Sequence, residues 1–126
     1  MEKKIEYVES EKFKKDFKRL EKRFRSLKAD LEVAKKYAIE MYHPVKRLDN
    51  QSVFLMPGFC DDKVLICKLK KFACRSLKGS SSRSGIRVIY AYKVESQKIV
   101  FLEIYFKGDK EMEDRGRIQG YLLSLS

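Results

Sequence analysis

The sequence predicts a single α+β domain over residues 1–126, in which helices pack on a small, twisted and mainly antiparallel sheet. A length of 126 residues suits one domain that can bury a real core. The runs Gly85–Tyr92 and Lys98–Lys107 are rich in β-branched and aromatic residues, and the polar segment Val94–Gln97 between them has hairpin length. Aromatic residues at helical spacing near the N-terminus supply the α part. We expect the element order βααβββα, with an N-terminal helical hairpin and a C-terminal helix packed on the sheet.

The N-terminal part is expected to hold a short strand followed by a helix. Ile5–Val8 alternates in polarity, which predicts the strand, and Ser10 is a suitable N-cap for the helix. Apolar residues recur at spacings of four, three and four, so one stripe of the helix is apolar and belongs to the core. The stripe consists of Phe13, Phe17, Leu20 and Phe24.

A second helix is expected directly after the first. Ser26 is its expected N-cap, and His43-Pro44 ends it because the residue before a proline avoids the helical region. The short Arg25-Ser26 connection predicts an antiparallel helical hairpin. The inward face is expected to carry Leu27, Leu31, Ala34, Ala38 and Met41.

The remaining elements follow from turn signals and alternation. Val53–Met56 is either a short extra strand or a packed loop, and Val64–Cys74 is expected to be a strand. The composition of Lys78–Ser84 predicts a flexible loop. Asp109 is expected to cap a last helix that extends to about Leu123.

The pleat of the last strand predicts its two faces. Glu103, Tyr105 and Lys107 would line an exposed concave face, and Arg87 occupies the neighbouring strand. An arginine inside a strand costs too much to bury alone, so Arg87 is either exposed on that face or paired with Glu103. The opposite face should pack against helices through Val100, Leu102, Ile104 and Phe106.

The charge balance indicates an anionic partner. The chain has 29 Lys and Arg residues against 18 Asp and Glu residues, which gives a net charge of +11. Such an excess attracts polyanions, namely nucleic acid, an acidic membrane surface or an acidic protein. Many of the lysines between residues 12 and 36 are expected only to solvate helix faces.

Other functional classes find little support in the composition. Three cysteines without a CxxC pair and a single histidine do not make an ordinary zinc site, so we expect no metal and no cofactor. Cys67 and Cys74 are expected to be buried core thiols. The N-terminus lacks the apolar core of an export signal, and no apolar run reaches the ~18 residues that span a bilayer. We therefore expect a cytoplasmic protein without a membrane partner.

Three segments in register resemble the RelE/ParE toxin superfamily of bacterial toxin–antitoxin modules. They are Glu11–Leu20 (EKFKKDFKRL) after a short first strand, Gly85–Tyr90 (GIRVIY), and Ile104–Lys107 (IYFK) before a final helix. Each motif alone is loose, but their order agrees with that family over most of the chain.

The resemblance implies an endoribonuclease of the RelE type. Such toxins cleave mRNA without a metal, usually in the ribosomal decoding site, by attack of the RNA 2′-hydroxyl on the adjacent phosphate to leave a 2′,3′-cyclic end. This chemistry needs cations around the scissile phosphate and groups that move protons. The resemblance also implies an antitoxin, and an acidic partner segment folding over the basic face would suit the charge of this chain.

The resemblance assigns site residues by position. Arg87 matches the strand arginine that contacts the phosphate. Basic residues near the ends of strands correspond to the other catalytic positions, and further cations and one tyrosine correspond to RNA contacts. The catalytic set is Arg87, Lys71, Arg75 and Lys107; the RNA-binding set is Tyr105, Lys78, Arg83 and Lys70.

The sequence also departs from the family pattern and leaves alternatives open. Where relatives carry a catalytic histidine, this chain reads Tyr105-Phe106-Lys107, and the C-terminal tyrosine of the family has no clear counterpart. One alternative is a ParE-like inhibitor that binds DNA gyrase without chemistry of its own. The other is a degenerate relative, a basic domain that binds nucleic acid and does not cleave it.

Overall fold

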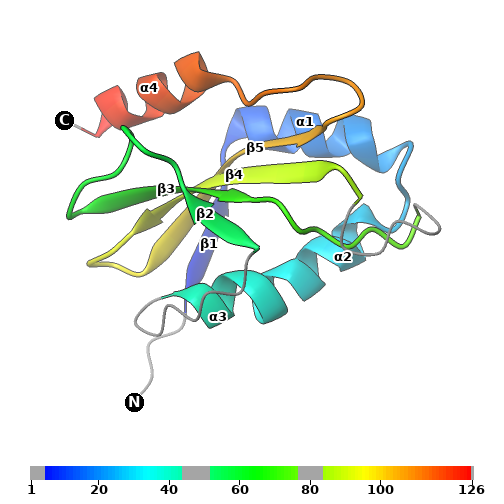
Figure 1. Cartoon of the computed structure of the whole chain (residues 1–126), viewed down its shortest axis with the longest axis horizontal. Coiled ribbons are helices and arrows are strands. Elements are labelled where there is room, and N and C mark those ends of the chain that lie inside the picture. The colour runs from blue at the N-terminus through cyan, green and yellow to red at the C-terminus, as the bar shows by residue number, and fades with distance from the viewer. Residues whose placement is uncertain (1–4, 44–51, 77–83, 126) are drawn as a thin grey trace.

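A sheet with helices on both sides forms the centre of the computed structural model, which describes residues 5–43, 52–76 and 84–125 (Figure 1). The sheet has five strands in the order β1-β5-β4-β3-β2; β1 pairs in parallel with β5, and the other neighbours are antiparallel. The strands are β1 (Glu6–Glu9), β2 (Val53–Leu55), β3 (Val64–Leu69), β4 (Ile86–Lys93) and β5 (Lys98–Phe106). The α+β class is confirmed.

The helical segments surround this sheet, with α2 and α4 on opposite sides of it (Figure 1). The segment after α2 continues as a π-helical turn, η1, and a last short turn, α3. The bounds are α1 (Glu11–Glu21), α2 (Leu27–Ala34), η1 (Lys35–Ile39), α3 (Glu40–Tyr42) and α4 (Arg115–Ser124). Val53–Met56, which the sequence predicted to be either a strand or a packed loop, contains the strand β2. The expected order βααβββα therefore lacked one strand.

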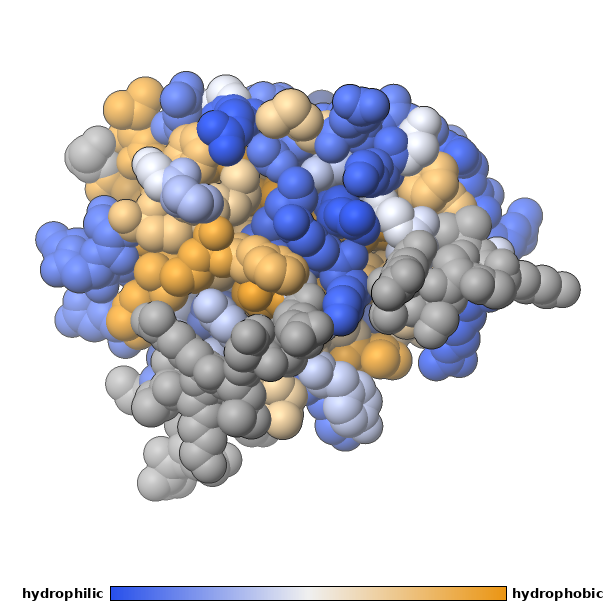
Figure 2. All heavy atoms as spheres, viewed as in Figure 1, coloured by the Kyte–Doolittle hydropathy of each residue, from blue (hydrophilic) through white to orange (hydrophobic). Residues whose placement is uncertain are grey.

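The surface is mixed in character. In the space-filling view, a band of hydrophilic residues crosses the middle of the molecule beside a hydrophobic area (Figure 2). In residues 5–43, 52–76 and 84–125, no helix combines the length and apolar character needed to cross a membrane.

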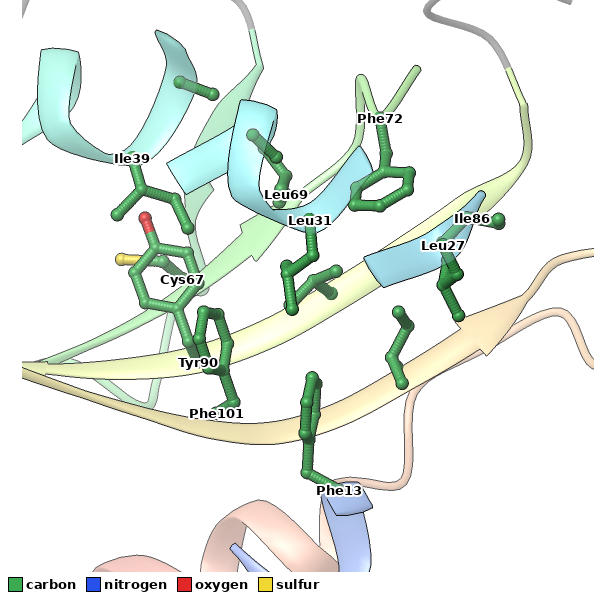
Figure 3. Close-up of a cluster of buried hydrophobic side chains, with 14 of the residues drawn as sticks. Phe13, Leu27, Leu31, Ile39, Cys67, Leu69, Phe72, Ile86, Tyr90 and Phe101 are labelled. Carbon is green, nitrogen blue, oxygen red and sulfur yellow. The ribbon is translucent and has the colours of Figure 1, made fainter. Parts of the chain in front are cut away.

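The larger core cluster confirms the aromatic stripe predicted for the first helix. Ser10 caps α1 by accepting a hydrogen bond from the backbone N–H of Phe13 at 3.2 Å. Phe13 is 0% exposed and stacks on Phe101 of β5, with ring centroids 5.0 Å apart. Side chains of α1 and α2, among them Phe13, Leu27 and Leu31, therefore share one core cluster with Phe101 of β5 (Figure 3). Cys67 and Cys74 are buried free thiols, as predicted.

The π-helical turn η1 corrects the predicted inward face of the second helix. Leu27, Leu31, Ala34 and Ala38 are buried, but Met41 is 48% exposed. A π-helical turn holds more residues than an α-helical turn, so the positions after it rotate around the helix. Ile39, which is 0% exposed, takes the place next to the sheet.

This rotation predicts unequal costs for two neighbouring truncations. Ile39→Ala should lower the free energy of unfolding by about 2–5 kcal/mol, because it leaves a cavity in the core. Met41→Ala should change it by less than about 0.5 kcal/mol, because the side chain is half exposed. Urea unfolding of both variants measures the difference, and equal costs would contradict the inward position of Ile39.

One predicted N-cap holds in position only, and another is wrong: Ser26 stands at the N-cap position of α2, whereas Asp109 does not cap the last helix. Ser26 makes no capping hydrogen bond with its side chain; its Oγ lies 2.6 Å from Oδ2 of buried Asp30 and donates to it instead. The last helix begins at Arg115 rather than near Asp109, because Asp114 accepts the hydrogen bond from the backbone N–H of Arg117 at 3.0 Å.

A β-bulge in β5 corrects the predicted faces of that strand. Ile89 of β4 lies opposite Glu103 and Tyr90 lies opposite Phe101, which leaves Leu102 as an extra residue. The extra residue reverses the alternation beyond it. Val100 and Leu102 therefore belong to a second core cluster together with Tyr105. Ile104 belongs instead to the cluster under α1 and α2.

Helix α4 covers the face that was expected to be open. Ile118 of α4 is 1% exposed and packs in the second cluster with Val100 and Leu102. Glu103 is 2% exposed and Tyr105 is 5% exposed, so the prediction that they line an exposed concave face is wrong. The reason is that Glu103 binds the segment before α4, by accepting a hydrogen bond from the N–H of Asp114 at 2.8 Å and pairing with Lys110.

Candidate nucleic-acid interface

Three strands bring cationic residues to one end of the sheet. Leu69 pairs with Val88, and the backbone N–H of Lys70 donates to the carbonyl of Ser52, so Lys70 lies beside Arg87 at the end of β3. The backbone N–H of Lys107 donates to the carbonyl of Gly85 at 2.8 Å. Lys107 therefore lies beside the residue that precedes β4. We call Lys70, Arg87 and Lys107 the cationic sheet end.

Arg87 is held at this end by a backbone contact. Its side chain is partly exposed, and Nη1 donates a hydrogen bond to the carbonyl of Lys70 at 3.0 Å. A guanidinium has five N–H donors, so this contact uses only part of its capacity. Of the two alternatives from the sequence, the pair with Glu103 does not form, because Glu103 is bound to Lys110 and to Asp114.

The cationic sheet end has no carboxylate partner among residues 5–43, 52–76 and 84–125. The neighbouring cations differ in this respect. Lys68 Nζ lies 2.7 Å from Glu113 Oε1, and Arg115 Nε lies 3.4 Å from Glu113 Oε2. The net positive charge at the sheet end is therefore available to an external anion.

Tyr105 lies on the same face as Arg87, but its ring is buried against two lysines. Tyr105 and Arg87 are directly opposite each other in the β4–β5 pairing. Lys68 Nζ and Lys110 Nζ lie 5.9 and 5.4 Å from the centroid of the Tyr105 ring, within the range of cation–π attraction. With 5% exposure, the ring offers no free face for a base, which corrects the expected stacking role.

Two other predicted catalytic residues lie beside α2 on the opposite side of the sheet. Arg75 is anchored to Asp30 of α2, with its backbone N–H 3.2 Å from Oδ2 and its Nε 3.8 Å from Oδ1. Lys71 lines a groove together with Val33 and Tyr37. The structure thus brings Arg87, Lys70 and Lys107 together and leaves Lys71 and Arg75 apart from them. The predicted RNA contacts Lys78 and Arg83 lie outside the described residues.

The ion pair between Lys68 and Glu113 attaches the segment before α4 to β3. Burial acts to raise the pKa of Glu113, but hydrogen bonds from Lys68 and from backbone and Arg115 donors outweigh it, and the pKa is lowered. Burial acts to lower the pKa of Lys68, yet the hydrogen bond to Glu113 raises it above its ordinary value. Each charge therefore stabilises the other in the folded state.

The lowered pKa of Glu113 predicts how stability depends on pH. Its stabilising effect is present above the ordinary value of 4.5 and is lost as the pH falls through the lower folded value. Glu113→Gln should therefore lower the free energy of unfolding at pH 7 by about 1–3 kcal/mol, and the gap to wild type should close at acid pH. Urea unfolding at pH values from about 3 to about 7 measures the difference in free energy of unfolding between wild type and Glu113→Gln. Exposed Glu111→Gln is the control, and a gap independent of pH would contradict the assignment.

The sequence missed one further residue of this face. Phe54 of β2 lies opposite Lys68, and Lys68 lies opposite Ile89 of β4. Because Ile89 and Arg87 are two residues apart on one strand, Phe54 lies on the same face of the sheet as Arg87. It is 39% exposed, and Lys70 Nζ lies 4.7 Å from its ring centroid. The run Val53-Phe54-Leu55 was the only available signal, and its pairing partner was not predictable from local pattern.

The fold and this site together define an α+β protein with a cationic patch at one end of its sheet, whose three members have no carboxylate partner in the part of the chain that the structure describes. No family model, no curated protein and no solved structure matches the chain.

Proposed function

We propose that the chain is a RelE-type toxin domain that cleaves mRNA without a metal and is neutralised by an acidic antitoxin. In this proposal the N-terminal helices form the hairpin of that fold, and α4 is its C-terminal helix. The observation that carries the proposal is the cationic sheet end, where Arg87, Lys70 and Lys107 meet without a carboxylate partner in the described residues. Cytoplasmic localisation belongs to the same proposal.

The chemistry of the proposal is an internal transfer at phosphorus. The 2′-oxygen of the RNA bonds to the adjacent phosphorus as the P–O5′ bond breaks, the 2′-hydroxyl loses its proton, and the 5′-oxygen gains one. Negative charge builds on the phosphoryl oxygens in the transition state, and fixed cations stabilise it there. Arg87 is held by β4 and by its contact with Lys70, so it can hold its donors toward such a phosphate. Lys70 and Lys107 add positive charge on either side.

The direct test is an mRNA cleavage assay in a purified translation reaction. We expect the added chain to cut the translated mRNA and to leave 2′,3′-cyclic phosphate ends, which the mapping of fragment termini detects. A DNA gyrase supercoiling assay runs in parallel. Inhibited gyrase with intact mRNA would replace the proposal by the ParE-like alternative. Salt-sensitive binding of RNA without any product would replace it by the degenerate binding domain.

A further inference from the structure

Phe54 is an exposed aromatic residue that the core does not use. Its neighbours in β2 point the other way: Val53 is 4% exposed and lies in the cluster under α1 and α2, and Leu55 packs against that cluster. Phe54 belongs to neither core cluster, and 39% of it is exposed. The exposed part of this apolar ring costs hydration free energy that burial by a bound ligand would recover.

Backbone pairing fixes Phe54 next to the cationic sheet end. Phe54 lies opposite Lys68 on β3, and the backbone N–H of Lys70 donates to the carbonyl of Ser52 at 2.8 Å. Because residues of one face alternate along each strand, Phe54 and Lys70 are diagonal neighbours on the face that also carries Arg87. The Lys70 Nζ lies 4.7 Å from the ring centroid, and the Lys70 carbonyl accepts the hydrogen bond from Arg87 at 3.0 Å.

We propose that Phe54 and Lys70 form a base-stacking platform for single-stranded RNA, in which a base lies on the Phe54 ring while the adjoining phosphate contacts Lys70 and Arg87. Aromatic rings bind the faces of bases, and those faces are accessible only when the strand is unpaired. An exposed ring beside cations that lack a carboxylate partner in the described residues combines the two contacts that single-stranded nucleic acids use. The platform depends on the proposed RNA cleavage, since it defines the form of RNA that reaches the cationic sheet end.

The chain offers a matched control on its opposite side. Tyr37 is 66% exposed, and Lys36 Nζ lies 5.5 Å from its ring centroid, so this pair resembles Phe54 and Lys70 in chemistry. It lies on η1 beside α2, on the other side of the sheet from Arg87. A general preference of RNA for exposed lysine–aromatic pairs would affect both sites equally.

The test measures binding of a fluorescent 2′-O-methyl oligouridine, which the chain cannot cleave. Phe54→Leu should weaken binding of this oligomer by roughly 5- to 150-fold. Phe54→Tyr keeps an aromatic ring and should bind almost as tightly as wild type. Tyr37→Leu should bind as tightly as wild type. An abasic oligomer of equal length isolates the base contact, and Phe54→Leu should bind it as wild type does. Lys70→Ala should reduce the slope of log affinity against log salt by about 0.7, and Phe54→Leu should leave that slope unchanged.

The outcomes separate this platform from the proposed function. If wild type cleaves mRNA and Phe54→Leu binds oligouridine as tightly as wild type, the platform is overturned and the proposed function is not. An equal loss on the abasic oligomer would also overturn it, because the effect would then not come from a base. Wild type that neither binds the oligomer nor cleaves mRNA would overturn both. Urea unfolding of Phe54→Leu, expected to match wild type because the ring lies outside the core, shows that the variant is folded.

Discussion

Replacing Arg87 by alanine is expected to reduce mRNA cleavage by roughly a hundred- to a thousandfold, which corresponds to ~2–4 kcal/mol of barrier. The guanidinium is fixed by β4 and by a 3.0 Å hydrogen bond to the carbonyl of Lys70, and it has no carboxylate partner among the described residues. A cation placed in this way stabilises the charge that builds on a phosphate during attack. Initial cleavage rates and growth arrest on expression both report the loss.

Two comparison variants separate charge from position. Arg87→Lys keeps the charge but loses the planar guanidinium, so we expect partial activity. Arg75→Ala removes a cation that is paired with Asp30 beside α2, and we expect it to lose far less activity than Arg87→Ala. Unchanged toxicity of Arg87→Ala would refute the catalytic role of the cationic sheet end.

Arg87 also has a structural contact that must be measured separately. Loss of its hydrogen bond to Lys70 should cost about 0.5–1.5 kcal/mol of folding free energy. Urea unfolding of Arg87→Ala measures this cost. A fully folded variant without cleavage activity supports the role in chemistry, whereas an unfolded variant would attribute the loss of activity to stability.

Phe13→Ala is expected to have the largest effect on stability, lowering the free energy of unfolding by about 3–5 kcal/mol. Phe13 is 0% exposed and lies between α1 and β5, where its ring stacks on Phe101 at 5.0 Å and lies 6.0 Å from that of Phe17. Its removal leaves a cavity that these rigid rings fill poorly. Because small domains are stable by only about 5–15 kcal/mol, this variant should lose much of its total stability.

Urea or thermal unfolding measures the effect, with Tyr37→Ala as the control. Tyr37 is 66% exposed, so its truncation should change stability by less than about 0.5 kcal/mol. Equal costs at the two positions would mean that α1 does not pack on β5 through Phe13.

Local pattern predicted several parts of the molecule that are confirmed. The stripe that begins with Phe13, the Ser10 cap, the burial of Cys67 and Cys74 and the α+β class all agree with the structure. Each of these features depends on residues within a few positions of one another or on overall composition. The position of Arg87 inside a strand was equally local, because β-branched and aromatic neighbours surround it in sequence.

Arg87, Lys70 and Lys107 were all among the residues singled out in the sequence, but which of the predicted cations lie together was not predictable. Lys71 and Arg75 are as basic as Lys70 and Lys107, yet they lie beside α2, because Asp30 anchors Arg75 and Lys71 lines the groove next to Val33. Phe54 joined the face of Arg87 only through the pairing of β2 with β3. Such pairings connect residues far apart in sequence, and no local spacing records them.

The sequence by itself determined the class of the fold, the apolar face of α1 and the positive charge, because periodicity and composition act locally. Only the tertiary structure decided which face each side chain occupies. The bulge at Leu102 reverses the alternation of faces along β5, and the π-helical turn at Lys35–Ile39 rotates the positions that follow it around the helix. Neither irregularity is visible in the composition. The bulge moves Tyr105 and Glu103 to the face covered by α4 and the segment before it, and the π-helical turn leaves Met41 exposed to solvent. Arg87 lies next to Lys70 through a separate pairing, that of β4 with β3. Small changes of register have these large consequences because neighbouring residues in a strand point to opposite faces.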